Sequence, residues 1–308
     1  MKIIRYPQLH PLAKKSCVTI GNFDGVHKGH QQLISQVVKQ AKKHQCYSAV
    51  VTMQPLPQQY FSGKYSVDLL TGVKLKAKML QKLGVDVWCV LNFNQRLANM
   101  QAIEFYQKIL IAGLASRYVL VGDDFRFGSN RQGGYNELKK WGQVDGVVVE
   151  RMSSIEITGI RVSSTVLREL LAAGDFVRAK ALLGRDFNLI GRVAHGRKKG
   201  RELGFPTLNL ELKQGGFPLH GIYITKVKIG SRYYPSVTSV GNNPTVGGNA
   251  KRVEVHVLDF DEVIYGQTVE VLFYKKLRNE VEFGSLAELT VAIAQDVKAG
   301  REFFAQNY

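Results

Sequence analysis

The character of the sequence changes near residue 184, and this change limits the folds open to the chain. Before that point, short apolar runs rich in β-branched residues alternate with stretches of helical periodicity. Such alternation builds a parallel sheet with helices on both faces. Beyond it, strand-like runs are separated by turns of glycine, proline and asparagine, which is typical of a small antiparallel β-barrel. We therefore expect two domains, 1–183 of α/β type and 184–308 of β type, each large enough for its own core.

The first half contains the clearer periodicities. Apolar residues recur at i, i+1, i+4, i+5 and i+8 from Leu33 to Ala41, which predicts one buried face of a helix. Towards the end of this half, two short helices are expected over 163–183, with Gly174 ending the first and Asp175 capping the second. The apolar runs predict strands at 17–23, 47–53, 85–93, 117–121 and 146–151.

The second half is predicted to be mainly strands, followed by one helix. Ser285 and Glu288 form an S-x-x-E capping box, which predicts a final helix ending near Asn307. The strands are expected at 223–229, 233–240, 253–260 and 268–274.

Composition narrows the class of partner without choosing it. The net charge of +17 favours anions, among them nucleotide phosphates, RNA or an acidic membrane surface, but it also suits a basic surface that only maintains solubility. The amino terminus lacks the apolar core of a secretory signal, and no apolar run approaches the roughly 20 residues of a membrane helix. Cys17, Cys46 and Cys89 lack zinc-site spacing. Together these features favour reduced thiols in a cytoplasmic protein.

The stretch GNFDGVHKGH, residues 21–30, follows the first predicted strand and precedes the first predicted helix. Carboxyl ends of parallel strands and amino termini of helices both favour phosphate, and Gly29 would let a phosphate approach the backbone. His27 and His30 could donate hydrogen bonds to it, which suits nucleotidyl transfer. A surface histidine pair and a metal site are the alternatives, although no third ligand cluster follows.

Three segments carry a family resemblance. TIGNFDGVHKGHQQLI (19–34), VGDDFRFGSNRQGG (121–134) and RVSSTVLREL (161–170) resemble signatures of the prokaryotic bifunctional riboflavin kinase/FAD synthetases. The amino-terminal module of that family transfers AMP from ATP to FMN. The resemblance implies a Rossmann-like nucleotidyltransferase sheet over residues 1–183.

The resemblance also implies roles for individual residues. His27 and His30 would be catalytic, and ATP contacts are implied at Gly21, Phe23, Asp24, Gly29, Ser163, Ser164, Thr165 and Arg168. Flavin contacts are implied at Asp124, Phe125, Arg126 and Phe127. The alternatives are an ordinary helix cap with a surface arginine for the serine segment, and core aromatics for the two phenylalanines. Leu56 departs from the family, which usually carries histidine between the prolines of this segment.

GRVAHGRKKGRELGFPTLNL, residues 191–210, invites comparison with a phosphate-binding P-loop. Arg197 and Lys198 stand where that motif requires lysine and a hydroxyl, so the comparison fails. The segment instead resembles the Gly-Phe-Pro-Thr-x-Asn hallmark of the family's riboflavin kinase module, a small antiparallel barrel. The resemblance implies that Thr207 and Asn209, on one face of a strand, place Mg²⁺ against ATP. ATP contacts are implied at Gly191, His195, Gly196, Gly204 and Pro206.

KRVEVHVLDF, residues 251–260, alternates valines with Arg252, Glu254 and His256, so one face is apolar and the other ionisable. A half-exposed strand explains the pattern, but the resemblance implies that Glu254 is the base acting on the ribityl hydroxyl. It also implies that Arg278 and Glu280 shape a flavin pocket, for which a salt-bridged surface loop is the alternative.

The expected function is a two-step synthesis. Riboflavin would be phosphorylated by ATP with Mg²⁺ to give FMN, and FMN would then be adenylylated to FAD with release of pyrophosphate. Neither nucleic acid nor membrane is an expected partner. The alternatives are an RNA-facing relative of the class I tRNA synthetases, a non-catalytic flavin-binding protein, and a riboflavin kinase with weakened adenylyltransferase activity.

Overall fold

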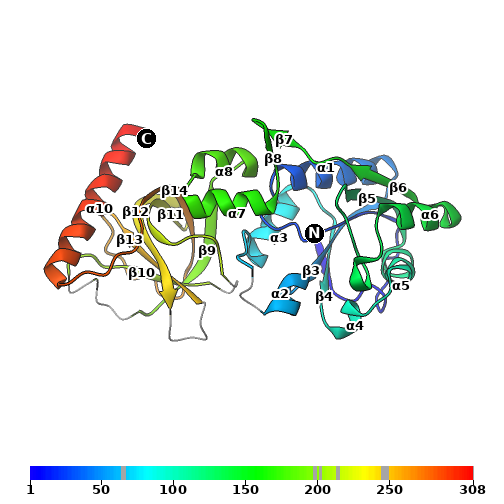
Figure 1. Cartoon of the computed structure of the whole chain (residues 1–308), viewed down its shortest axis with the longest axis horizontal. Helices are drawn as coiled ribbons and strands as arrows, with labels where there is room; N and C mark the ends of the chain where they lie inside the picture. Colours follow the sequence, from blue (N-terminus) through cyan, green and yellow to red (C-terminus); the bar gives the residue numbers. More distant parts are fainter. Residues whose placement is uncertain (64–66, 197–199, 201–202, 213–215, 244–249, 308) are drawn as a thin grey trace. The chain divides into compact units, whose positions relative to one another are not determined.

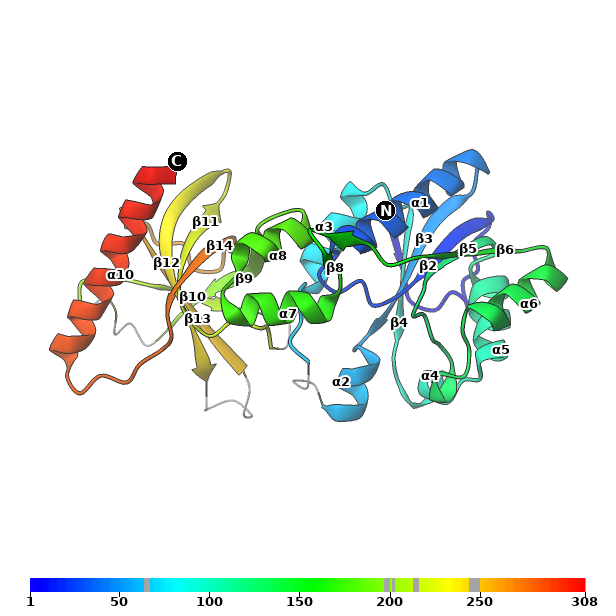
Figure 2. The ribbon, with the colours of Figure 1, turned by 45° about the horizontal axis from the view of Figure 1, so that its top comes forward.

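The structure is a computed structural model that describes residues 1–63, 67–196, 200, 203–212, 216–243 and 250–307. The chain forms two compact units (Figures 1 and 2). Unit 1 comprises Met1–Ser66 and Lys74–Ser163, and unit 2 comprises Val67–Val73 and Ser164–Tyr308. The helices α7 (Ser164–Ala173) and α8 (Phe176–Leu183) thus group with unit 2. This grouping describes packing, and the boundary between the two activities, placed at 183/184 from the sequence, is still a prediction.

Unit 1 is built on a parallel sheet with the strand order β1-β4-β3-β2-β5-β6. The chain runs outward from β2 through β3 to β4, then returns to place β5 on the other side of β2. Ligands of such sheets bind where the order reverses, at the carboxyl ends of the strands. The strands are β1 (Lys2–Ile4), β2 (Ser16–Ile20), β3 (Tyr47–Gln54), β4 (Val87–Asn92), β5 (Ser116–Gly122) and β6 (Val148–Met152). The five predicted strands are confirmed, and β1, three residues long and mostly exposed, was missed.

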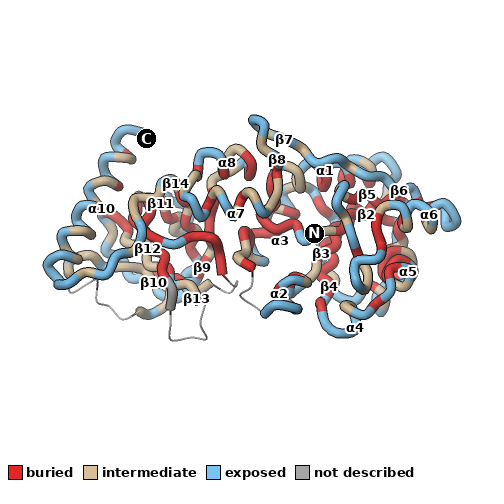
Figure 3. The backbone as a smooth tube through the Cα atoms, viewed as in Figure 1, coloured by how far each residue is buried: buried red, intermediate tan, exposed pale blue. Residues whose placement is uncertain are grey.

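Helices cover both faces of this sheet, as its apolar strands require. Successive residues of β2 enter different cores: Cys17 packs with the buried face of α1 (Lys28–Lys43), and Val18 with the π-helix η1 (Tyr106–Gly113). Figure 3 shows buried backbone along the central strands. The remaining elements of unit 1 are α2 (Pro57–Ser62), α3 (Val73–Lys82), α4 (Gln95–Ala98), α5 (Ala102–Phe105), η2 (Ser129–Arg131), α6 (Tyr135–Asp145), β7 (Glu156–Ile157) and β8 (Ile160–Arg161).

Unit 2 is a closed antiparallel barrel with the strand order β10-β13-β12-β11-β14-β9, which confirms the predicted architecture. Its strands are β9 (Phe187–Ala194), β10 (Leu208–Glu211), β11 (Gly221–Ile229), β12 (Arg232–Asn243), β13 (Ala250–Val257) and β14 (Thr268–Arg278). The final helix α10 (Leu286–Asn307) begins after Ser285, whose Oγ accepts from the Glu288 N–H at 3.2 Å. The Glu288 carboxylate accepts from the Gly284 N–H, one residue earlier than in a standard capping box.

Two further expectations are met. Asp175 caps α8, its carboxylate accepting from the Arg178 N–H at 3.0 Å. Of the three cysteines expected to be reduced thiols, Cys17 and Cys89 are buried, and burial raises the pKa of each to about 12, which disfavours the reactive thiolate; Cys46 is half-buried. Within the described residues, no helix has the length and apolarity that crossing a membrane requires.

Candidate functional sites

The loop of residues 21–26 leaves the carboxyl end of β2 in an unusual backbone conformation. Phe23, Gly25 and Val26 have positive φ angles of 48°, 86° and 41°. Positive φ is costly for a β-branched residue, and such strain persists only where packing enforces it. Phe23 and Val26 are buried in the same core as α1, so the core holds this loop in place.

The two predicted catalytic histidines meet at the start of α1. His27 is the N-cap, and its Nδ1 accepts from the His30 N–H at 3.2 Å. Since Nδ1 is an acceptor, the proton of a neutral His27 lies on Nε2. The two rings stack with centroids 3.5 Å apart, and a Cβ on Gly29 would lie 3.3 Å from the His27 ring. The helix begins at Lys28, within the stretch that was expected to precede it, because His27 itself supplies the cap.

The surroundings of His30 disfavour its charged form. Burial, then the nearby His27 and Lys76, hold the pKa of His30 well below its ordinary value. Its Nδ1 is buried and has no hydrogen-bond partner within the described part of the chain. Unsatisfied polar atoms of this kind are uncommon and are retained mainly at functional positions.

Lys76 on α3 was not predicted as a site residue from the sequence. In the structure it contacts the loop of residues 21–26, which precedes His27. Its side chain is buried, and Nζ donates to the Asn22 carbonyl at 2.7 Å. Burial lowers the pKa of Lys76, and the charge of the buried Asp24 opposes that shift. The only feature of the sequence that could have indicated Lys76 is its position on the apolar face of a helix, together with Leu75 and Leu80.

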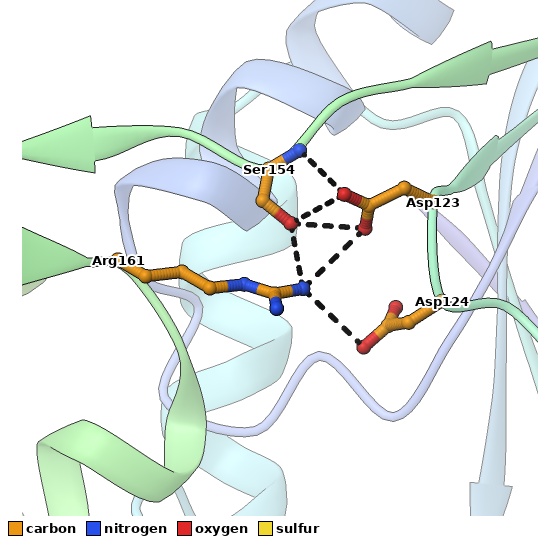
Figure 4. A network of polar contacts seen from close by, with 4 residues as sticks. All are labelled: Asp123, Asp124, Ser154 and Arg161. Carbon is orange, nitrogen blue, oxygen red and sulfur yellow. Dashed lines mark hydrogen bonds and ion pairs between the residues drawn. The ribbon is translucent and has the colours of Figure 1, made fainter.

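A polar network joins the loops that follow β5 and β6 (Figure 4). Ser154 Oγ donates to Asp123 at 2.8 Å, and Arg161 Nη2 donates to Ser154 Oγ at 2.8 Å. The Arg161 guanidinium also lies 3.9 Å from Asp124, one of the predicted flavin residues. Burial raises the pKa of Asp123, but the bonds from Ser154 and the charge of Arg161 leave it lowered overall. Neither Ser154 nor Arg161 was predicted as a site residue from the sequence.

The predicted aromatic pair is divided between core and surface. Phe127 is buried and packs near Phe105 and Trp141, which is the core placement left open by the sequence. Phe125 is half-buried and stacks on Phe127 with centroids 5.3 Å apart, while Arg126 is exposed. Flavin contact is therefore easier to assign to Phe125 than to Phe127.

The segment 161–170, in which four ATP contacts are predicted, contains the residue at which the chain passes from unit 1 to unit 2. Ser163 is the last residue of unit 1, and Ser164 and Thr165 open α7 in unit 2. Arg168 Nε donates to the Asp68 carbonyl at 2.6 Å, both within unit 2. The ATP contacts of these four residues are still a prediction. Leu56 is buried just before α2.

Unit 2 contains a cavity of about 840 Å³ between barrel strands and α10. It collects five of the residues predicted from the sequence: Thr207, Asn209, Glu254, Arg278 and Glu280. The ATP contacts predicted between residues 191 and 206, at Gly191, His195, Gly196, Gly204 and Pro206, do not line it. Its apolar wall includes Phe205, Val281, Phe283, Leu286, Leu289 and Ile293.

Strand register places the polar groups of this cavity side by side. Asn209 on β10 pairs with Glu254 on β13, and Glu254 pairs with Ser239 on β12. Gly196 approaches so closely that an added Cβ would lie 2.1 Å from Asn209 Nδ2. The alternating face of β13 is confirmed, since Val253, Val255 and Val257 are buried and Arg252, Glu254 and His256 line the cavity.

Charged side chains surround Glu254. Arg252 lies 3.9 Å from Glu254 and 3.7 Å from Glu280, and Glu280 also lies 3.3 Å from His220. Arg278 forms a two-pronged pair with Asp296 of α10, with its shortest distance 2.7 Å. Arg278 and Glu280 thus pair with other residues rather than with each other.

Two contacts organise the glycine-rich segment before β10. His256 Nδ1 lies 2.8 Å from the Pro206 carbonyl, which requires the proton of the imidazole on Nδ1. This bond ties β13 to the residue before Thr207. His195 stacks on Tyr265 with centroids 3.9 Å apart. Residues 197–199, 201 and 202 of the segment 191–210, in which ATP contacts are predicted, lie outside the described residues.

Comparisons with known proteins also divide the chain into two parts. The family model for FAD synthetase matches residues 10–166, and the model for riboflavin kinase matches residues 183–304. The chain is 41% identical to the bifunctional riboflavin kinase/FMN adenylyltransferase of Pseudomonas fluorescens, covering 99% of this chain and 98% of the relative. It is 38% identical to the protein of that name from Escherichia coli K12, with the same coverage.

A solved structure described as a macrolide-efflux protein from Streptococcus pneumoniae has the same fold. Its TM-score is 0.82 at 29% identity, and the match covers 97% of this chain and 98% of that one. A parallel sheet matched by the FAD synthetase model and a barrel matched by the riboflavin kinase model together define a two-module transferase. The chain belongs to the bifunctional riboflavin kinase/FMN adenylyltransferase family.

Proposed function

We propose that unit 2 phosphorylates riboflavin with ATP to give FMN, and that unit 1 adenylylates FMN to FAD and releases pyrophosphate. The observation that carries the proposal is the meeting of Thr207, Asn209 and Glu254 in one cavity that also has an apolar wall. An apolar wall suits a flavin ring, and convergent polar groups suit a phosphate donor.

Glu254 is the proposed base of the kinase step. Glu254 lines the cavity, 3.9 Å from Arg252, and a carboxylate can accept a proton. Deprotonation of the primary ribityl hydroxyl lets its oxygen attack the γ-phosphorus of ATP, and ADP leaves.

Thr207 and Asn209 fit the requirements of Mg²⁺. Both supply neutral oxygen donors on the cavity wall, and Mg²⁺ usually combines one or two protein oxygens with phosphate oxygens and water. When bound there, the ion would neutralise charge on the transferring phosphoryl group. Within the described residues no cluster of three histidine, cysteine or acidic side chains offers a self-sufficient metal site, which fits an ion held partly by substrate.

The adenylyl transfer of unit 1 is assigned to the histidine pair. The imidazoles of His27 and His30 and the amino terminus of α1 favour a polyphosphate without a covalent nucleophile. Attack of the FMN phosphate on the α-phosphorus would then need positioning and charge stabilisation. Ser163, Ser164, Thr165 and Arg168 are proposed as further phosphate contacts, and Asp124 and Phe125 as flavin contacts.

The proposed substrates are therefore riboflavin, FMN and ATP. The proposed location is the cytoplasm, because free cysteines fit a reducing compartment. One assay tests the proposal: purified protein is given riboflavin and Mg·ATP, and the products are separated by chromatography. FMN and FAD should both appear. FMN alone would refute the assignment of unit 1, and neither product would refute both assignments.

A further inference from the structure

Lys76 is a buried cation beside the histidine motif for which the proposed chemistry has no use. It lies on the buried face of α3, whereas Lys74 and Lys78 of the same helix are exposed. Lysine is rarely buried unless its charge and its donors are satisfied. The contacts of Lys76 therefore indicate what it does.

The first contact of Lys76 holds the backbone of the 21–26 loop. Nζ donates to the carbonyl of Asn22 at 2.7 Å, the residue directly before the left-handed Phe23. Phe23 and Val26 anchor the same loop through the apolar core, and the Gln31 side chain donates to the Val26 carbonyl at 2.8 Å. The loop is thus held from α3 at its start and from α1 at its end.

The second contribution is charge. Lys76 lies near the buried carboxylate of Asp24, and its positive charge also reaches His30. The titratable groups acting on His30 are thus His27 at the start of α1 and Lys76 on α3, with Asp24 balancing the lysine. A neutral His30 donates or accepts a hydrogen bond without having to lose a proton first.

We propose that Lys76 is a positioning residue of the adenylyl-transfer site: its ammonium group fixes the 21–26 loop through Asn22, balances the charge of Asp24 and places its positive charge near His30. The inference depends on the proposed function of the histidine pair. Displacement of catalytic groups by about 1 Å costs roughly 100-fold in rate, so loosening this loop should be visible in kinetics.

The test compares Lys76→Met with Lys74→Met, which removes the same charge from an exposed position of the same helix. FMN and Mg·ATP are supplied directly, so that the kinase step is bypassed, and riboflavin phosphorylation by unit 2 is measured in parallel. Lys76→Met should lower FAD formation by about 10- to 100-fold and leave FMN formation unchanged. FAD formation within twofold of that of Lys74→Met overturns the proposal.

A second measurement separates positioning from mere folding. The imidazole pKa of His30 is followed by NMR, with the resonance assigned from its loss in His30→Gln. It should rise in Lys76→Met and stay near the wild-type value in Lys76→Arg and Lys74→Met. If Lys76→Met does not fold, Lys76→Gln takes its place, and a His30 pKa equal to that of the wild type overturns the proposal.

The two possible failures can be told apart. If His30→Gln itself leaves FAD synthesis unchanged, the histidine site is wrongly assigned. If His30→Gln abolishes FAD synthesis and Lys76→Met does not, only the role of Lys76 is wrong.

Discussion

Asn209 on β10 and Glu254 on β13 lie directly opposite each other in the antiparallel pairing of the barrel. They are 45 residues apart in the sequence. Side chains of directly paired residues project from the same face, with Cβ atoms about 5 Å apart. The proposed base and a proposed ligand of the phosphate-bound cation are thus set beside each other by strand register.

The variant Glu254→Gln should stop the kinase step. Glutamine keeps the size of the side chain but cannot accept the ribityl proton, and loss of a general base costs about 10²- to 10⁴-fold. Chromatography of the products from riboflavin should show no FMN, while supplied FMN should still become FAD. Equal loss of both reactions would contradict separate sites.

Gly196→Ala should weaken the kinase step through Asn209. The added methyl group would lie 2.1 Å from Asn209 Nδ2, so the amide must move, and we expect a loss of about 10- to 100-fold in FMN formation. The control is a double-mutant cycle with Asn209→Ala, in which the effect of Gly196→Ala should largely vanish. Strictly additive effects would show that Gly196 acts elsewhere.

Arg278→Met should destabilise unit 2. Asp296 is buried, and the variant would leave its carboxylate without the arginine that joins β14 to α10. Hydrogen bonds to charged groups contribute about 1.5–3 kcal/mol, and we expect a loss of about 2 kcal/mol in unfolding free energy. Calorimetry measures the loss, and Arg278→Met combined with Asp296→Leu should recover part of it, because no unpaired charge remains.

Unit 1 should become less stable as the pH falls from 7 towards 5. Because the folded state holds the pKa of His30 well below its ordinary 6.5, the unfolded chain binds more protons than the folded protein in this range. One such proton changes stability by at most about 1.4 kcal/mol per pH unit, and the change ends once the pH falls below the folded pKa.

The chain has two tryptophans, Trp88 and Trp141, and both lie in unit 1, so their fluorescence during denaturation reports on this unit. The variant His30→Gln should reduce the dependence of the stability of unit 1 on pH. An unchanged slope would assign the effect to other groups.

Local sequence determined much of the fold. Apolar runs located five of the six strands of the parallel sheet, and glycine, proline and asparagine turns indicated the barrel. Asp175 and Ser285 were recognisable as helix caps, because capping depends on residues within one turn. The three-residue β1 was missed, since it gains its place only from pairing with the distant β4.

Some residues of the candidate sites could likewise be predicted from local sequence, and others only from the tertiary structure. His27, His30, Thr207, Asn209 and Glu254 stand in short motifs whose residue types carry the chemistry, so the sequence was sufficient to select them. Lys76, Ser154 and Asp296 were singled out by no motif. Their roles come from contacts between segments far apart in the chain, and burial and charge at such contacts exist only once the tertiary structure has formed.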